Sequence, residues 1–375
     1  MPTAAGHADP VRVMIVDDSA VIRGLLARAL DADPDITVVA SVANGQMALD
    51  TIGRADIDVV ILDIEMPVLD GLTALPKLVA AAPTVKIIMA STLTRHNAEV
   101  SLKALGAGAS DYIPKPTSTR EIGHADDFKR DLVAKVKALG AAKRAADGPR
   151  QARPVPAAGT RSAASAKPPP AAPIVLRRDK IVPPRVLAIG SSTGGPQALF
   201  RILGGLDKTM TLPILITQHM PPTFTTILAE HLATVGKRPC AEAVDGEPVK
   251  EGRVYVAPGN FHMTVEAAAG GACIRLTQDP PENYCRPAVD PMLRSLAKVY
   301  GGQVLAAILT GMGHDGLKGS QAVTAAGGSV IAQDEATSVV WGMPRAVAVG
   351  GLCTAVLPVT EIAGYLSGAV AGRRA

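Results

Sequence analysis

Three residues in the second half of the chain have the side-chain types of a hydrolytic triad, and each follows a short apolar run. Ser192 follows VLAIG, His219 closes ILITQH, and Asp315 lies in TGMGHDG directly after VLAAIL. A serine hydroxyl attacks a carbonyl carbon when a base accepts its proton and an acid holds that base in one tautomer. Because such a triad depends on geometry and not on chain order, these residues are predicted to be its nucleophile, base and orienting acid.

The glycine-rich stretch around Ser192, AIGSSTGGPQAL, has two interpretations. Gly190, Ser192 and Gly194 match the pattern G-x-S-x-G, which places a nucleophilic serine on a strand-to-helix turn. The dinucleotide fingerprint G-x-G-x-x-G instead requires a glycine where Ser192 stands and an acidic residue at the end of the next strand, which closes at His219. The following helix is expected to begin near Pro196 and to offer free N–H groups to an anion. The serine interpretation is favoured, and nucleotide binding is kept as the alternative.

Three other histidines compete with His219 for the role of base. His314 is adjacent to Asp315, but neighbouring residues of one loop usually point in different directions. His231 and His262 lie in AEHLA and NFHMTV, which indicate a helix face and the start of a strand. We therefore expect His231 and His262 to be structural, and His314 is the rival base.

A second group of reactive side chains lies in the first half of the chain. Asp17 and Asp18 follow VMIV, Asp63 ends DVVILD, Ser91 ends KIIMAS, and Lys115 lies in DYIPKP. Carboxylates that are forced together need a cation, and a hard ion such as Mg²⁺ prefers their oxygen atoms. An Asp carboxylate can also accept a phosphoryl group covalently. Lys115 would neutralise the charge of that group, and the Ser91 hydroxyl would donate a hydrogen bond to one of its oxygens. A phosphorylation site that requires Mg²⁺ is therefore predicted where these apolar runs end.

The elements that must position both groups are short apolar strands separated by helical stretches. They are VMIV, ITVVASV, DVVILDI, KIIMAST and DYIPKP, followed in the second half by VLAIG, PILITQH, VYVAPG, VLAAILTG, SVIAQD and LCTAVL. Such alternation predicts parallel sheets covered by helices on both faces, with ligands beyond the carboxyl ends of the strands. Since 375 residues are too many for one ordinary core, the predicted fold class is α/β with two doubly wound domains.

A basic, proline-rich segment separates these two parts of the chain. Residues 141–185 contain ten Lys and Arg against Asp147 and Asp179, a net charge of +8 within an overall +4, so the remainder carries −4. A segment of this composition cannot form a hydrophobic core, so it is predicted to be a flexible linker. The predicted boundaries are 11–135 for the first domain, 136–184 for the linker and 185–372 for the second domain. Because the basic charge is confined to the linker and only 3% of residues are aromatic, no nucleic-acid partner is predicted.

Other features narrow the class of protein further. The start of the chain lacks the basic and apolar regions of a signal peptide, and no uncharged apolar run is long enough to cross a bilayer. The cysteines show no C-x-x-C pair and no zinc spacing, which indicates reduced thiols. We therefore expect a cytoplasmic protein with no direct membrane insertion.

Residues 11–135 resemble a two-component receiver domain, whose fold is flavodoxin-like. The resemblance rests on VDDS, DIEMPVLDG, the end of KIIMAS, and DYIPKP, and the pattern D-x-x-M-P-x-x-D-G is highly specific. It implies that Asp63 is the phosphoacceptor and that Asp17, Asp18 and Asp63 hold Mg²⁺. It further implies that Tyr112 changes rotamer on phosphorylation and that the Lys115–Pro116 bond is cis, which proline makes less costly.

Residues 185–370 resemble the catalytic domain of the chemotaxis protein-glutamate methylesterases, the CheB family. The resemblance rests on IGSSTGGPQAL, ITQHMPPTFT, VYVAPGNFHM, TGMGHDGLKG and AQDEATSVVWGMP, in this order. It assigns five roles: nucleophile Ser192, base His219, orienting acid Asp315, oxyanion donor Met312 through its backbone N–H, and site-shaping Thr193. Cys285 and Ala288 in CRPAVD depart from the family pattern, which has His and Ser at these places.

The resemblance implies a phosphorylation-regulated enzyme that hydrolyses glutamate γ-methyl esters on chemoreceptors, releasing methanol, and that also deamidates specific receptor glutamines. The implied substrates are methyl-accepting chemotaxis receptors, and the implied phosphodonor is the chemotaxis histidine kinase. The esterase step would need no cofactor, and the receiver would cover the esterase cleft until Asp63 is phosphorylated. The alternative is a non-enzymatic response regulator whose second domain binds a partner or nucleotide, although no helix-turn-helix with a basic face follows the linker.

Overall fold

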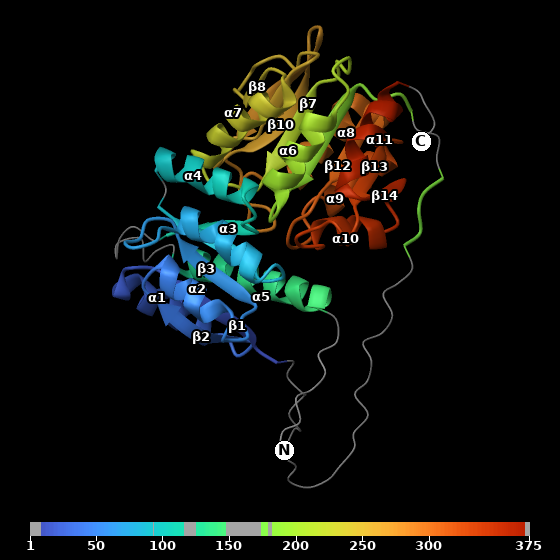
Figure 1. The fold of residues 1–375 in the computed structure, drawn as a ribbon. Helices are drawn as coiled ribbons and strands as arrows, with labels where there is room; N and C mark the ends of the chain where they lie inside the picture. The colour runs from blue at the N-terminus through green and yellow to red at the C-terminus, as the bar shows by residue number, and fades with distance from the viewer. Residues whose placement is uncertain (1–8, 93, 116–124, 148–173, 179–181, 372–375) are drawn as a thin grey trace, which may run out of the picture.

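The apolar runs of the first half form a five-stranded parallel sheet with strand order β2-β1-β3-β4-β5. The computed structural model describes residues 9–92, 94–115, 125–147, 174–178 and 182–371, and Figure 1 shows the sheet of this first domain with helices around it. Its strands are β1 (Val11–Val16), β2 (Ile36–Val42), β3 (Val59–Asp63), β4 (Lys86–Ser91) and β5 (Asp111–Pro114). Its helices are α1 (Ala20–Asp31), α2 (Gly45–Ile52), α3 (Gly71–Ala81), α4 (Arg95–Gly106) and α5 (Ala125–Asp147).

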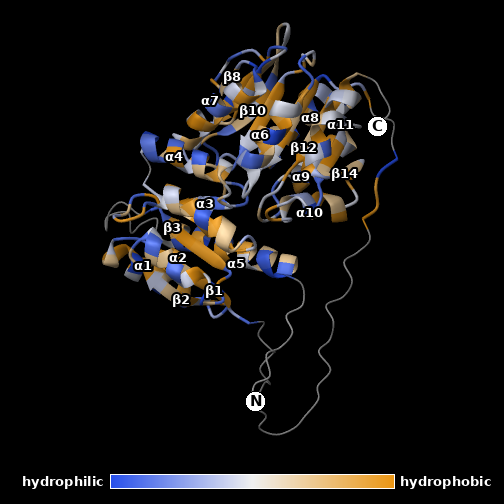
Figure 2. Ribbon diagram, in the orientation of Figure 1, coloured by the Kyte–Doolittle hydropathy of each residue, from blue (hydrophilic) through white to orange (hydrophobic). Residues whose placement is uncertain are grey.

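Helices cover both faces of this sheet, as the apolar strands require. α1 and α5 pack on one face, and α2, α3 and α4 pack on the other. The middle strand β3 is completely buried and is strongly hydrophobic in Figure 2. The first turn of α3 lies against the end of β3, because a Cβ atom on Gly71 would come within 1.9 Å of the Asp63 carbonyl oxygen. The glycine of the motif DIEMPVLDG therefore allows a close approach beside Asp63.

The second half forms a seven-stranded parallel sheet with order β14-β13-β12-β6-β7-β9-β8. Its strands are β6 (Val186–Ser191), β7 (Ile214–Gln218), β8 (Cys240–Glu242), β9 (Val254–Val256), β12 (Val304–Ile308), β13 (Ser329–Gln333) and β14 (Ala355–Leu357). Its helices are α6 (Gly195–Gly205), α7 (Phe224–Gly236), α8 (Val289–Tyr300), α9 (Leu317–Ala325), α10 (Met343–Val349) and α11 (Val359–Val370). α6, α7 and α11 pack on one face, and α8, α9 and α10 on the other. The prediction of two doubly wound α/β domains is confirmed.

The second domain has two further features, of which the sequence indicated only a strand that starts at His262. β10 (His262–Ala268) and β11 (Gly271–Thr277) form a separate antiparallel hairpin, and β8 adds a short edge strand to the main sheet. The hairpin pairs His262 with Thr277 and Ala268 with Gly271, and it packs on α8 through buried residues such as Val265 and Ile274. All strand pairs of the seven-stranded sheet are thus parallel, and the antiparallel hairpin lies outside it.

α5 extends past residue 136, where the linker was predicted to begin. α5 continues to Asp147, and Leu132, Val136 and Leu139 on it are buried against the face of the sheet that contains β1. This helical spacing of apolar side chains stabilises the helix beyond the predicted boundary. Residues 148–173 and 179–181 of the predicted linker, and Pro116 of the predicted cis Lys115–Pro116 bond, lie outside the described residues.

The two domains contact each other through α4, β5 and α5 of the first. α4 lies beside α7 in Figure 1. At the centre of the interface, the ring of Tyr112 stacks on that of Phe224, with centroids 4.4 Å apart and an angle of 10° between the planes. Both rings are buried. Within the part of the chain that the structure describes, no helix is long and apolar enough to span a bilayer.

Candidate active site

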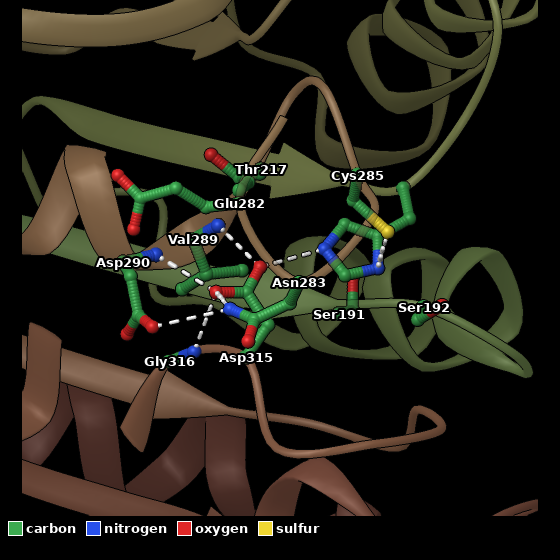
Figure 3. Close-up of polar contacts among 12 residues, drawn as sticks. Ser191, Ser192, Thr217, Glu282, Asn283, Cys285, Val289, Asp290, Asp315 and Gly316 are labelled. Atoms are coloured by element: carbon green, nitrogen blue, oxygen red, sulfur yellow. Dashed lines mark hydrogen bonds and ion pairs between the residues drawn. The ribbon is translucent and has the colours of Figure 1, made fainter. Parts of the chain in front are cut away.

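The three central strands of the second sheet form the edge that contains the predicted triad. β6 lies between β7 and β12, so the chain crosses to the opposite side of β6 when it forms β12. Where the strand order changes direction in this way, a crevice forms beyond the carboxyl ends of the strands. Ser192, His219 and Asp315 follow β6, β7 and β12 at this point, as the sequence predicted, and Figure 3 shows Ser192 and Asp315 there.

Asp315 is a buried carboxylate that holds His219 in place. Its Oδ2 lies 2.8 Å from His219 Nε2. The carboxylate also accepts hydrogen bonds from the backbone N–H groups of Val289 (2.6 Å), Asp290 (3.1 Å) and Gly316 (2.9 Å), and from Asn283 Nδ2 (3.0 Å). Burial raises the pKa of this carboxyl group, but the contact with His219 and the backbone donors outweigh burial and lower the pKa to about 2. Asp315 is therefore ionised at neutral pH and places a ring proton of His219 on Nε2.

The other ring nitrogen of His219 faces a sulfur atom. Cys285 Sγ lies 3.4 Å from His219 Nδ1, and Figure 3 shows this contact as a dashed line from Cys285. Burial lowers the pKa of His219, but the Cys285 sulfur and the Asp315 carboxylate outweigh it and raise this pKa well above its usual range. His219 thus has an orienting acid on one side and an ionisable nucleophile on the other.

Ser192 is half-buried in the turn after β6. Its backbone N–H donates to the carbonyl oxygen of Thr310 at 3.0 Å. A Cβ atom on Gly311 would lie 2.8 Å from the Ser192 Cβ, so the turn after β12 needs a glycine there. Gly194, with a φ of 76°, opens α6, which has Pro196 in its first turn as predicted. Among the described residues no hydrogen bond joins the Ser192 hydroxyl to His219, and Figure 3 shows Ser192 to one side of the Asp315 network.

Thr193 and Met312, predicted to shape the site, lie where the two domains meet. Thr193 Oγ1 donates to Asp111 Oδ2 of the first domain at 2.8 Å, and its carbonyl oxygen accepts from Thr310 Oγ1 at 2.8 Å. Met312 packs against a hydrophobic cluster that contains Val340 and residues of the first domain. Both residues flank the Ser192 turn, and both are tied to the neighbouring domain.

The competing histidines occupy other positions. His314 is exposed in the turn before Asp315, and it is His219 that contacts the Asp315 side chain. His262 is buried at the start of β10, where its Nδ1 accepts from the Ala288 N–H at 3.2 Å and its Nε2 lies 3.2 Å from the Pro280 carbonyl oxygen. His231 lies on α7 beside Phe200. The structural interpretation of His231 and His262 agrees with these positions.

Sequence reasoning missed two polar residues that support Asp315. Asn283 donates to Asp315 and, at 3.3 Å, to Asp290 Oδ2. Asp290 is buried, accepts from the Gly319 N–H at 2.6 Å, and has a pKa that burial and the nearby Asp315 raise. Asn283 lies in a loop with a φ of 52°, and nothing in its sequence position indicated a contact with a residue 32 positions away.

The acidic group of the first domain is assembled as predicted. Carboxylate oxygens of Asp17, Asp18 and Asp63 lie within 4.8 Å of one another. Lys115 Nζ lies 2.6 Å from Asp17 Oδ2 and 2.6 Å from Asp63 Oδ1. Burial raises the pKa of Asp63, while Lys115 opposes that effect. Ser91 is buried at the end of β4 near this group, and its Oγ accepts from the Ser101 hydroxyl at 3.0 Å.

Comparison with known proteins assigns the chain to a family. The response regulator receiver domain family matches residues 13–125, and the CheB methylesterase family matches residues 187–366. A protein-glutamate methylesterase/protein-glutamine glutaminase of Azospirillum brasilense is 62% identical over 97% of this chain and 94% of its own length. The chain belongs to the CheB methylesterase family.

A second curated relative and a solved catalytic domain also match this chain. A protein-glutamate methylesterase/protein-glutamine glutaminase of group 2 operon from Rhodospirillum centenum is 60% identical over 99% of this chain and 96% of its own length. The crystal structure of the Thermotoga maritima CheB methylesterase catalytic domain is 45% identical, covers 50% of this chain and 98% of that domain, and gives a TM-score of 0.48. By the alignments with the two curated relatives, this chain spans nearly the whole length of each.

Proposed function

We propose that this CheB protein hydrolyses γ-methyl esters of glutamate side chains on methyl-accepting chemotaxis receptors in the cytoplasm and releases methanol. The observation that carries this proposal is the contact of 2.8 Å between His219 and the buried Asp315 at the sheet edge that also holds Ser192. This arrangement supplies a base with a fixed tautomer at the same sheet edge as the serine. The names of the relatives agree with this reaction.

The reaction would proceed through an acyl-enzyme. Because Asp315 holds the proton on Nε2, Nδ1 of His219 is the nitrogen that accepts the Ser192 proton as Oγ attacks the ester carbonyl carbon. The same nitrogen then protonates the departing methoxide. Water attacks the acyl-enzyme with His219 again as the base, which frees the glutamate. The Met312 N–H and the first turn of α6 are proposed as donors to the oxyanion.

The same steps would deamidate specific receptor glutamines. An amide differs from the ester only in its leaving group, which departs as ammonia after His219 protonates it. The relatives' names include the glutaminase activity. The esterase and glutaminase steps use only residues of the chain, and we propose no cofactor for them.

We further propose that Asp63 accepts a phosphoryl group from the chemotaxis histidine kinase. Asp17, Asp18 and Asp63 present hard oxygen donors within 4.8 Å, a set that fits Mg²⁺. The ion would offset the negative charge of the entering phosphoryl group. Lys115 Nζ lies 2.6 Å from Asp63 Oδ1, and this ammonium group and the Ser91 hydroxyl would contact the phosphoryl group.

Phosphorylation would control the esterase through the interface between the domains. Thr193, next to the proposed nucleophile, donates to Asp111 of the receiver, and the proposed switch residue Tyr112 stacks on Phe224 of the esterase domain. A receiver held in this position covers the side of the cleft that Thr193 and Met312 form. Weakening these contacts would expose the cleft to receptor helices.

The test is methanol release from methylated receptor membranes. Ser192→Ala should abolish it, and His219→Ala should lower it by roughly three or more decades, since the two residues act as a unit. His314→Gln is the matched control and should keep most of the activity, because His314 is exposed and does not contact Asp315 in the way His219 does. An active Ser192→Ala protein, or a dead His314→Gln protein beside an active His219→Gln protein, would overturn the assignment. Neither the non-enzymatic alternative nor nucleotide binding at Gly190 is favoured by the relatives' names.

A further inference from the structure

Cys285 lies in a tight loop that fixes its position beside the proposed base. Its backbone N–H donates to the Glu282 carbonyl oxygen at 2.9 Å, and the Glu282 N–H donates back to the Cys285 carbonyl oxygen at 3.2 Å. Glu282 is in turn paired with Arg294 of α8. The half-buried Cys285 side chain points its sulfur at His219 Nδ1, 3.4 Å away (Figure 3).

Cys285, His219 and Asp315 therefore form a chain of nucleophile, base and orienting acid. A thiol with a base within hydrogen-bond reach loses its proton readily as it attacks, and sulfur is intrinsically more nucleophilic than a serine oxygen. In this structure the base faces the Cys285 sulfur, and no described contact links it to the Ser192 hydroxyl. The same ring nitrogen would serve both nucleophiles, so the two side chains compete for it.

The other cysteines lack this environment. Burial raises the pKa of the Cys240 and Cys353 thiols to about 12, which keeps both protonated. Cys273 lies on β11 and is half-buried, as Cys285 is in its loop. Among the described residues, the Cys273 side chain has no contact with a histidine. Cys273 is thus a matched control for exposure without a base.

We propose that Cys285 is a peroxide-reactive thiol, activated by His219 and Asp315, whose oxidation switches the serine site off. The sulfur attacks one oxygen of hydrogen peroxide, an S–O bond forms, and the O–O bond breaks. The second peroxide oxygen leaves as hydroxide and takes up the thiol proton that His219 has accepted, which gives one water and the sulfenic acid of Cys285. The sulfur loses two electrons, and the peroxide gains them.

The sulfenic hydroxyl would lie against His219 Nδ1, to one side of the line from the sulfur, and would donate a hydrogen bond to the base. Ser192 then has no acceptor for its proton, and hydrolysis stops. A small thiol reverses the change: it first forms a mixed disulfide with Cys285 and releases water. A second thiol then frees Cys285 and leaves as the small-molecule disulfide. The thiol chemistry stands by itself, whereas its effect on hydrolysis rests on the proposed function.

The experiment exposes the full-length protein to hydrogen peroxide at neutral pH. Sulfenic acid is trapped with dimedone, and the rate at each cysteine is measured by peptide mass spectrometry. Cys285 should react at least ten-fold faster than Cys273. His219→Gln should slow the Cys285 reaction at least ten-fold and leave the Cys273 rate unchanged, which also reports that the variant is folded. Asp315→Asn provides a second variant and should slow the Cys285 reaction several-fold.

Methanol release is followed in the same samples. Activity should fall in step with the oxidised fraction of Cys285 and return with dithiothreitol, in the wild-type protein and in Cys273→Ser alike. Whatever activity Cys285→Ala retains should be the same before and after peroxide. Equal rates at Cys285 and Cys273, or a Cys285 rate that ignores both His219→Gln and Asp315→Asn, would refute the activated thiol. Full activity with oxidised Cys285 would refute the switch. An untreated protein without esterase activity would refute the proposed function while the trapping rates still test the thiol.

Discussion

Gln197 offers a direct test of the idea that the receiver restrains the esterase. This half-buried side chain on α6 donates from Nε2 to the Ala109 carbonyl oxygen of the receiver at 2.8 Å. One such neutral hydrogen bond contributes about 1 kcal/mol net. If the unphosphorylated protein is mostly closed, Gln197→Ala should raise the open fraction, and with it the unstimulated rate of methanol release, about five-fold.

The assay compares methanol release by the full-length proteins with and without a small phosphodonor and Mg²⁺. The variant and the wild type should differ without phosphodonor and converge when it is saturating, because the interface is then already open. Arg95→Ala is the control: the exposed pair of Arg95 with Glu230 also crosses the interface, but exposed pairs contribute little, so its rate should change less than two-fold. An unchanged rate in Gln197→Ala, or an equal increase at saturating phosphodonor, would show that this interface does not limit activity.

Three further predictions follow from the charged groups. Phosphodonor with Mg²⁺ should raise methanol release, and Asp63→Asn should block that rise; stimulation of the variant would exclude Asp63 as the phosphoacceptor. Asp58 is fully buried beside Arg12 and Arg144, and its pKa is lowered from 3.8 to about 2. A carboxyl group whose pKa is lowered by folding stabilises the folded state at any pH above the pKa that it has in the unfolded chain. Asp58→Asn should therefore lower the free energy of unfolding by about 2 kcal/mol at pH 7, and by progressively less as the pH falls from 3.8 toward 2. Urea unfolding of the receiver at pH 7 and pH 3 measures this difference, and an equal loss at both pH values would contradict it. Because His219 must be neutral to act as a base and its pKa is raised, kcat/KM should rise with pH and reach half of its plateau above pH 6.5, and a half-maximum below that value would contradict the assignment.

The buried strands of the two parallel sheets, and the residues that end them, were predictable because such strands appear in the sequence as unbroken apolar runs. β3 and β12 are examples, with every residue buried. The carboxyl end of each run marks the sheet edge, which is why His219 and Asp315 could be placed together from the sequence. The extent of α5 was not read from the sequence, because the boundary was drawn from the composition of the basic segment and not from the apolar spacing of Val136 and Leu139.

Contacts made by irregular loops were not predictable. Asn283 and Tyr284 have positive φ angles, and the loop that contains them brings Cys285 to His219 across 66 positions of sequence. No periodic pattern encodes such a contact, because the loop is held by separate partners: Glu282 pairs with Arg294 of α8, and Arg286 donates hydrogen bonds to Asn260. The sequence indicated the start of β10 at His262 but not its pairing with β11, since the solvent-exposed half of the hairpin does not show the apolar run of a buried strand.

The stacked rings of Tyr112 and Phe224 have a consequence for the flow of phosphoryl groups. A free-energy coupling between two sites acts equally in both directions. If phosphorylation at Asp63 separates these rings, then a receptor helix that separates them by entering the cleft must in turn favour phosphorylation. The phosphorylated state would then be more stable in enzyme molecules already engaged with a receptor, so that the signal is held where the substrate is.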